Sequence, residues 1–197
     1  MAVSKSSRRN PSSTWALLDV ALSHFQDHIR AKSDRCSLSI IDLLHVSNFK
    51  GGNASITEVA AGLSEKLPVY EAAIREIAES FGGMKLAELN DEKAGELQDR
   101  CKAFLALTRD RAHRIRGFGP SYASALLAAH FPELIPVLDR RGLNGAGIPV
   151  KKNRQGQVKN IESYYSDLID AFRRELRRYP ETEMRKLDRA WFIKPIK

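Results

Sequence analysis

The chain contains little cysteine and no long apolar run, and both absences narrow its class. Only two of its 197 residues are cysteines, Cys36 and Cys101, and they are too far apart to form a Cys-x-x-Cys pair. Two isolated thiols fit a reducing compartment. Because no stretch of about 18 apolar residues occurs, we expect no helix that spans a membrane.

The fingerprints of common cofactor sites are absent as well. The chain has no phosphate-binding G-x-x-x-x-G-K-[ST] loop, no dinucleotide-binding glycine motif and no G-x-S-x-G nucleophile elbow. His24 and His28 stand four residues apart, a spacing that zinc can use, but no third ligand is evident. We therefore expect neither a metal nor an organic cofactor.

Positive charge is abundant and concentrated in one part of the chain. The net charge is +8, and residues 109–159 hold ten Lys or Arg against three acids, a net of +7. A local excess of this kind is typical of a protein that binds a polyanion. A basic surface that only keeps the protein soluble is the alternative.

Apolar residues recur at helical spacing through most of the chain. The pattern predicts helices at about residues 14–29, 39–50, 57–67, 70–80, 91–107, 109–116, 120–130, 160–178 and 181–192. Pro68 is expected to end the third helix, and residues 145–159 are expected to form a loop. No segment shows sustained alternation, so the fold class is all-α, a compact multi-helix domain over residues 14–197. Residues 1–13 lack a signal-peptide core and are expected to be a disordered basic tail.

A tight turn and a lone carboxylate lie close together in the basic region. The turn is Gly117-Phe118-Gly119, and Pro120 fits the first turn of the helix that follows. Such a turn can present backbone N–H groups to a phosphate. Asp139 follows the apolar residues 136–138 about twenty positions later. The pair favours chemistry on a nucleotide, although a simple helix connector and a helix N-cap would also explain the turn and Asp139.

The block over residues 117–143 resembles the helix-hairpin-helix–GPD superfamily of DNA glycosylases. In its endonuclease III and adenine glycosylase branches, a Gly-hydrophobic-Gly hairpin precedes a helix and then a catalytic aspartate. Ser121 occupies the position of the Schiff-base lysine of bifunctional members, and Asp139 follows 18 residues later, as in those enzymes. Serine at this position resembles the adenine glycosylase branch. The four cysteines of that branch's iron–sulfur cluster are missing, and Asn48-Phe49-Lys50-Gly51 and residues 185–191 resemble a bacterial branch without the cluster.

The resemblance implies a helix-hairpin-helix motif at about residues 109–130 and a monofunctional DNA glycosylase. Such an enzyme flips a damaged or modified base out of double-stranded DNA and hydrolyses its N-glycosidic bond, leaving an abasic site. Asp139 would be the catalytic carboxylate, because a carboxylate beside C1′ stabilises the positive charge that develops on the sugar. The residues expected to hold the DNA backbone are Gly117, Phe118, Gly119, Ser121, Arg140, Arg141, Lys151, Lys152 and Arg154.

Phe49, Lys50 and Tyr122 are the expected pocket residues. Lys50 is also open to other roles, as a phosphate contact, an amine nucleophile or a solvated loop residue. We interpret Asp188, Arg189, Trp191 and Phe192 as core and ion-pair residues of the last helix.

Several expectations about the partner follow. The partner is double-stranded DNA, and the protein acts as a cytoplasmic, nucleoid-associated monomer in repair or in defence against modified DNA. One alternative is a non-catalytic helix-hairpin-helix DNA-binding protein. A second alternative is a protein-interaction subunit whose basic loop contacts an acidic partner.

Overall fold

The computed structural model describes residues 11–52 and 55–195, and this part of the chain is all-helical, as the periodicity predicts. The α-helices are α1 (Pro11–Ala31), α2 (Ile40–Phe49), α3 (Ala60–Phe81), α4 (Asp91–Leu107), α5 (Pro120–His130), α6 (Arg140–Gly145), α7 (Tyr165–Arg178) and α8 (Met184–Phe192). Two short 3-10 helices, η1 (Leu86–Glu88) and η2 (Ile161–Tyr164), precede α4 and α7. None of the described helices is long and apolar enough to cross a membrane.

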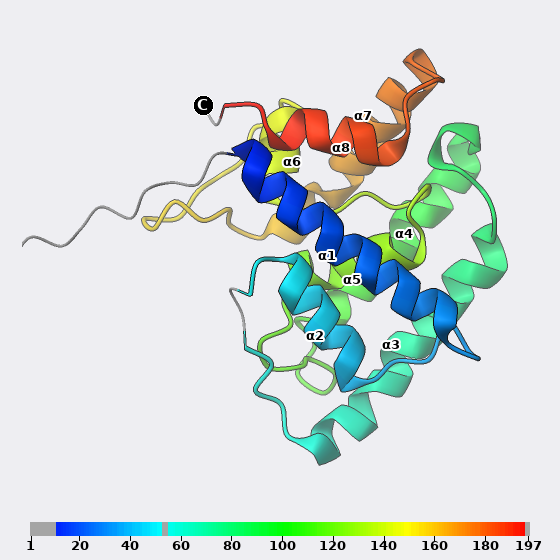
Figure 1. Ribbon diagram of the computed structural model, residues 1–197, viewed down its shortest axis with the longest axis vertical. Coiled ribbons are helices and arrows are strands. Elements are labelled where there is room, and N and C mark those ends of the chain that lie inside the picture. Colours follow the sequence, from blue (N-terminus) through cyan, green and yellow to red (C-terminus); the bar gives the residue numbers. More distant parts are fainter. Residues whose placement is uncertain (1–10, 53–54, 196–197) are drawn as a thin grey trace, which may run out of the picture.

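Helix α5 lies at the centre, and the other helices pack around it (Figure 1). It is apolar on nearly every side, with Pro120 and residues 123–129 all buried, and a helix of that composition belongs in a core. Helix α1 crosses the molecule and contacts α2, α5 and α8. The first and last helices of the described chain are therefore neighbours.

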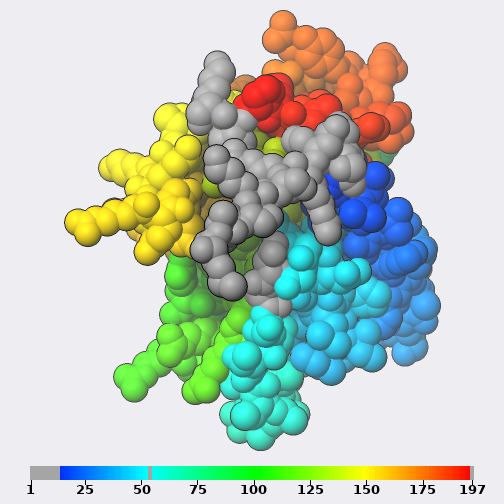
Figure 2. Space-filling view, turned by 60° about the vertical axis from the view of Figure 1, so that its left-hand side comes forward, coloured from blue at the N-terminus to red at the C-terminus, as the bar shows by residue number. Residues whose placement is uncertain are grey.

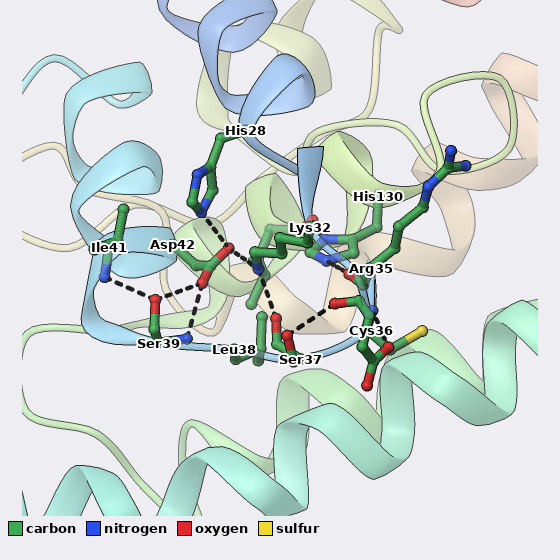
Figure 3. Close-up of polar contacts among 12 residues, drawn as sticks. His28, Lys32, Arg35, Cys36, Ser37, Leu38, Ser39, Ile41, Asp42 and His130 are labelled. Atoms are coloured by element: carbon green, nitrogen blue, oxygen red, sulfur yellow. Dashed lines mark hydrogen bonds and ion pairs between the residues drawn. The ribbon is translucent and has the colours of Figure 1, made fainter. Parts of the chain in front are cut away.

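A buried ion pair joins α1 to α2 (Figure 3). Asp42 is fully buried in the first turn of α2, where its carboxylate accepts from the backbone N–H of Ser39 at 2.8 Å and completes a capping box. Lys32 pairs with the same carboxylate, and His28 Nε2 lies 3.5 Å from Asp42 Oδ1. Because a buried charge is tolerated only with such partners, the pair fixes how α2 leaves α1.

Helix α3 runs through Pro68, so the prediction of two helices separated there is wrong. Proline removes one hydrogen bond, to the carbonyl of Ser64 four residues earlier. Pro68 and Ser64 are both exposed, so that carbonyl faces water. Apolar residues on the opposite face, from Leu63 to Phe81, pack continuously across the proline and hold one helix together.

The helix predicted over residues 109–116 is also wrong, because this segment forms turns. The Asp110 carboxylate accepts from the backbone N–H groups of Ala112 at 2.8 Å and His113 at 2.9 Å, and this competes with helical pairing. Ile115 is the segment's one buried apolar residue, so it has no apolar face to bury. The expected helix-hairpin-helix motif therefore has its second helix, α5, but not the first one adjoining the turn.

The start of α1 corrects the boundary of the expected tail. Helix α1 begins at Pro11, so residues 11–13 belong to a helix. The rest of the expected tail, residues 1–10, lies outside the described residues.

We predict opposite effects on stability from alanine at two helical glycines. A methyl group on Gly145 would overlap the Cα and Cβ of Trp191 and lie 2.7 Å from its carbonyl oxygen, so α6 and α8 must move apart. Overpacking of this kind costs about 1–3 kcal/mol. Gly95 in α4 has no neighbour within 4 Å of that position, so Gly95→Ala should stabilise the protein by about 0.5–1 kcal/mol through helix propensity. Urea unfolding of both variants checks this, and equal effects would contradict the packing of α6 on α8.

Candidate active site

A buried, extended segment leads directly to Asp139. Residues 134–138 are all buried, and hydroxyl groups from neighbouring helices bind their backbone. The Leu138 N–H donates to Ser124 Oγ at 2.9 Å, and Ser121 Oγ donates to the Leu138 carbonyl at 2.7 Å. Tyr165 on α7 donates to the Pro136 carbonyl at 2.9 Å. Because a buried backbone without partners is costly, these bonds fix the position of Asp139.

One carboxylate oxygen of Asp139 makes a structural contact, and the side chain also lines a cavity. It is the N-cap of α6, and its Oδ1 accepts from the Gly142 N–H at 2.7 Å. Its Oδ2 lies 3.5 Å from the Nζ of Lys50, which follows α2. The side chain is 24% exposed. One oxygen therefore holds the helix while the other faces a cation.

Asp139 and Lys50 line a cavity of about 240 Å³ whose lining also includes three aromatic side chains. Trp15, Phe49 and Phe192 supply the aromatic rings, from α1, α2 and α8. The volume is a little below the roughly 300–1,000 Å³ of sites for drug-sized ligands, which suits one flat ring system. A second cavity, of about 330 Å³, shares some of its lining but does not include Asp139.

Arg185 and Asp188 on α8 complete the charged lining of the cavity. Arg185 Nη1 donates to Asp188 Oδ2 at 2.7 Å, and the guanidinium carbon lies 3.8 Å from the centre of the Trp15 ring. Asp188 is 8% exposed. Burial raises the pKa of Asp188 to about 7, with Asp139 adding to the rise and Arg185 opposing it. The cavity thus holds two carboxylates with different environments beside two cations.

The two hairpin glycines differ in what the fold requires of them. Gly117 has φ +88°, and a side chain there would overlap the Ser55 carbonyl, so the packing of residues 55–57 against the turn explains this glycine. Gly119 has an ordinary φ of −93° and open space where a side chain would begin. Among the described residues, no acceptor pairs with the amides of Gly119 and Ser121. These amides, at the N-terminus of α5, are available to an anion.

The other residues of the expected hairpin serve the fold. Phe118 is buried and meets Tyr70 edge-on, at 5.8 Å between ring centres, so it supports the turn from inside. The Ser121 hydroxyl is used by Leu138. Tyr122 is half-buried, which raises its pKa, and it does not line the cavity beside Asp139.

The basic residues expected to contact phosphate lie in two places, on α6 and in the loop that follows it. Arg141 lies over the Phe192 ring at 4.8 Å and donates to the Phe192 carbonyl at 3.1 Å, so it ties α6 to α8. Arg140 is exposed and donates to the Gly156 carbonyl at 3.4 Å. Three further expected contacts are exposed in the loop after α6, namely Lys151, Lys152 and Arg154.

This loop is a short hairpin that projects from one side of the molecule (Figure 2, yellow). Lys152 and Val158 form an antiparallel bridge, and the Asn153 carboxamide oxygen accepts from the Gln157 N–H at 2.9 Å. The Arg109 side chain, from the turns before the glycine hairpin, pairs with Glu162 at 3.0 Å. This ion pair joins the turn segment to η2, the element that follows the basic loop.

Comparison with known proteins adds no relative. No protein-family model matches the chain, and no curated protein and no solved structure matches it. Within residues 11–52 and 55–195, no three His, Cys, Asp or Glu side chains are grouped so that they could hold a metal ion.

The structure brings together Asp139, Lys50 and Phe49, which sequence analysis places in the site. Among the residues that it adds to the cavity lining are Trp15, Phe192, Arg185 and Asp188. Asp188 is an ion-pair residue, as interpreted from the sequence, but its partner is Arg185, and Arg189 is exposed. Arg185 and Asp188 also line the cavity. The sequence signal for them is an Arg and an Asp three positions apart on an amphipathic helix, which is common on solvated surfaces.

We predict that Asp188→Asn changes how stability depends on pH. The folded pKa of about 7 lies above the unfolded value near 3.9, so the folded protein binds this proton more tightly. That contribution is complete below about pH 4 and is lost as the pH rises to about 7. Relative to wild type, Asp188→Asn should therefore gain stability from pH 4.5 to 7.5 in urea unfolding. A difference that stays constant with pH would contradict this role of Asp188. Asp167→Asn, at an exposed position on α7, is the matched control.

Proposed function

We propose that this protein is a monofunctional DNA glycosylase that hydrolyses the N-glycosidic bond of a flipped base. The observation that carries the proposal is the placement of the Asp139 carboxylate at an aromatic-walled cavity of about 240 Å³. Asp139 would stabilise the positive charge that builds on the deoxyribose as the bond breaks. The aromatic walls would stack the base after it leaves the duplex, which offsets part of the cost of unstacking.

Lys50 lies beside the proposed catalytic carboxylate. Its ammonium group is 3.5 Å from Asp139 Oδ2, and the Gly142 N–H donates to the other oxygen at 2.7 Å. Ser121, in the place of the lysine of bifunctional relatives, donates its hydroxyl to the fold. These contacts support a reaction with water instead of an amine.

The glycine turn before α5 and the basic hairpin after α6 would bind the phosphates of the DNA backbone. The amides of Gly119 and Ser121, at the N-terminus of α5, have no acceptor within the described part of the chain, and Lys151, Lys152 and Arg154 are exposed. Such contacts fix the register of the duplex without reading its sequence.

We predict that Asp139→Asn abolishes base release while it preserves the fold. Asparagine is as good an N-cap as aspartate, so the unfolding free energy should change by less than about 1 kcal/mol. Loss of the charge at the reacting carbon should slow excision by at least about 10²–10³-fold. The measurement is strand cleavage, with and without hot alkali, on duplexes that carry deaminated, oxidised, alkylated or hypermodified bases.

Each result of this assay has a meaning. Nicking only after alkali, lost in Asp139→Asn and kept in the control Asp167→Asn, supports a monofunctional glycosylase. Nicking without alkali would assign amine chemistry to Lys50. Full activity of Asp139→Asn would contradict catalysis by the Asp139 carboxylate. Binding without any product favours the non-catalytic DNA-binding alternative.

We predict that the basic hairpin contributes phosphate contacts that salt weakens. Each neutralised phosphate adds about −0.9 to the slope of log K against log salt concentration. Lys152→Ala should therefore make the slope shallower by about one, on any duplex sequence, as measured by fluorescence anisotropy. Arg174→Ala, at an exposed position on α7, should leave the slope unchanged. Weak binding with almost no salt dependence would instead favour an acidic protein partner.

A further inference from the structure

The ammonium group of Lys50 lies beside the proposed catalytic carboxylate, at the same cavity. Lys50 follows α2, and its side chain and that of Asp139 both line the cavity of about 240 Å³. The Lys50 Nζ is 3.5 Å from Asp139 Oδ2, and the Lys50 side chain is 14% exposed. An ammonium group has three donors and no acceptor, so it can face the carboxylate and a ligand in the cavity at the same time.

This position matters because the sugar and the base are joined next to Asp139. Under the proposed function, C1′ of the deoxyribose lies against the Asp139 carboxylate, and the base lies among the aromatic rings that line the cavity. A single carbon–nitrogen bond of about 1.5 Å joins C1′ to the base. The flexible four-carbon stem of lysine can span so short a step from the carboxylate. The Lys50 ammonium is therefore within reach of the atoms at which the base leaves.

Asp139 alone stabilises only one of the two charges that develop in the reaction. When the N-glycosidic bond of a neutral base breaks, positive charge builds on the sugar and negative charge builds on the base. The carboxylate attracts the sugar but repels the departing base. The cations in the described lining of the cavity are Lys50 and Arg185, and Arg185 donates to the carboxylates of Asp19 and Asp188. Lys50 is the cation next to the bond that breaks.

We propose that Lys50 is a second catalytic residue, which stabilises the negative charge of the departing base. This inference rests on the proposed glycosylase function. In the reaction, the bond between C1′ and the base nitrogen breaks, and its electron pair goes to the base. The oxygen of a water molecule bonds to C1′, and the proton that the water releases ends on the base. Lys50 and Asp139 are both unchanged at the end.

This role of Lys50 narrows the substrates to bases that are neutral in DNA. Deaminated and oxidised bases belong to this class, and they leave as anions. A base that already carries a positive charge, such as 7-methylguanine, leaves as a neutral molecule and develops no negative charge for the ammonium to stabilise. The charge of Lys50 also repels such a base in the cavity.

Lys50→Met tests this role, because methionine keeps an unbranched stem and removes the charge. Single-turnover excision of deaminated or oxidised bases from duplexes should slow by about 10²–10³-fold, as expected when one group that stabilises developing charge is removed. Release of 7-methylguanine should be no slower than in wild type. Lys102→Met, at an exposed position on α4, should leave all rates unchanged. Thermal unfolding shows that both variants are folded.

A second measurement separates an action on the base from an action through Asp139. The base that wild type releases fastest is compared with a form that carries an electron-withdrawing group, such as 5-fluorouracil beside uracil. That group stabilises the departing anion by itself, so Lys50→Met should lose less activity on the substituted base. An equal loss on both bases would show that Lys50 only positions Asp139, and it would overturn the contact with the base.

The outcomes distinguish the role of Lys50 from the proposed function. With excision by wild type established, full activity of Lys50→Met would overturn the role of Lys50. A larger rate enhancement by wild type for 7-methylguanine than for every neutral base would do the same without any variant, and so would nicking without alkali that depends on Lys50. No excision by wild type from any of these duplexes would overturn the glycosylase proposal and this role together.

Discussion

The candidate site depends on the burial of a non-helical stretch of backbone among helices. The Leu134 and Ile135 N–H groups donate to the Phe131 carbonyl, but the backbone of Pro136 and Leu138 is bound by side chains from α5 and α7. Ser124 bonds the Leu138 N–H, and Ser121 bonds the Leu138 carbonyl. The position of Asp139 is therefore set by the central helix α5, the helix whose N-terminus also carries the unpaired amides. The candidate phosphate site and the carboxylate belong to one rigid unit.

The cavity itself is built by residues that are far apart in the chain. Trp15 and Arg185 stand 170 positions apart, yet their ring and guanidinium stack. Close contact of α6 with α8 through Gly145 holds Arg185 and Asp188 beside the carboxylate. The buried pair of Asp42 and Lys32 orients α2, which brings Lys50 to the same place.

Sequence patterns predict the helical class and part of the site, because those depend on local spacing. The apolar face of α1 and the start of α5 at Pro120 are visible as periodicity and turn chemistry. The prediction that Pro68 ends a helix is wrong because the packing of the opposite face of α3 stabilises the helix by more than one lost hydrogen bond costs. The helix predicted over residues 109–116 does not form because its residues are mostly charged and provide no apolar face to bury. The placement of Arg185 has no local signal, since Arg185 meets the Trp15 ring only once α1 and α8 pack together.

The electrostatics of the cavity favour a division of roles between its two carboxylates. Asp139 is partly exposed, accepts from the Gly142 N–H and lies beside the Lys50 ammonium. Asp188 is buried, and its pKa of about 7 leaves it neutral for part of the time at physiological pH. Under the proposed function, the Asp139 carboxylate would face the sugar, while Asp188 holds Arg185 in place through their ion pair. Two carboxylates in such different surroundings suit a site in which one does the chemistry and the other supports the pocket.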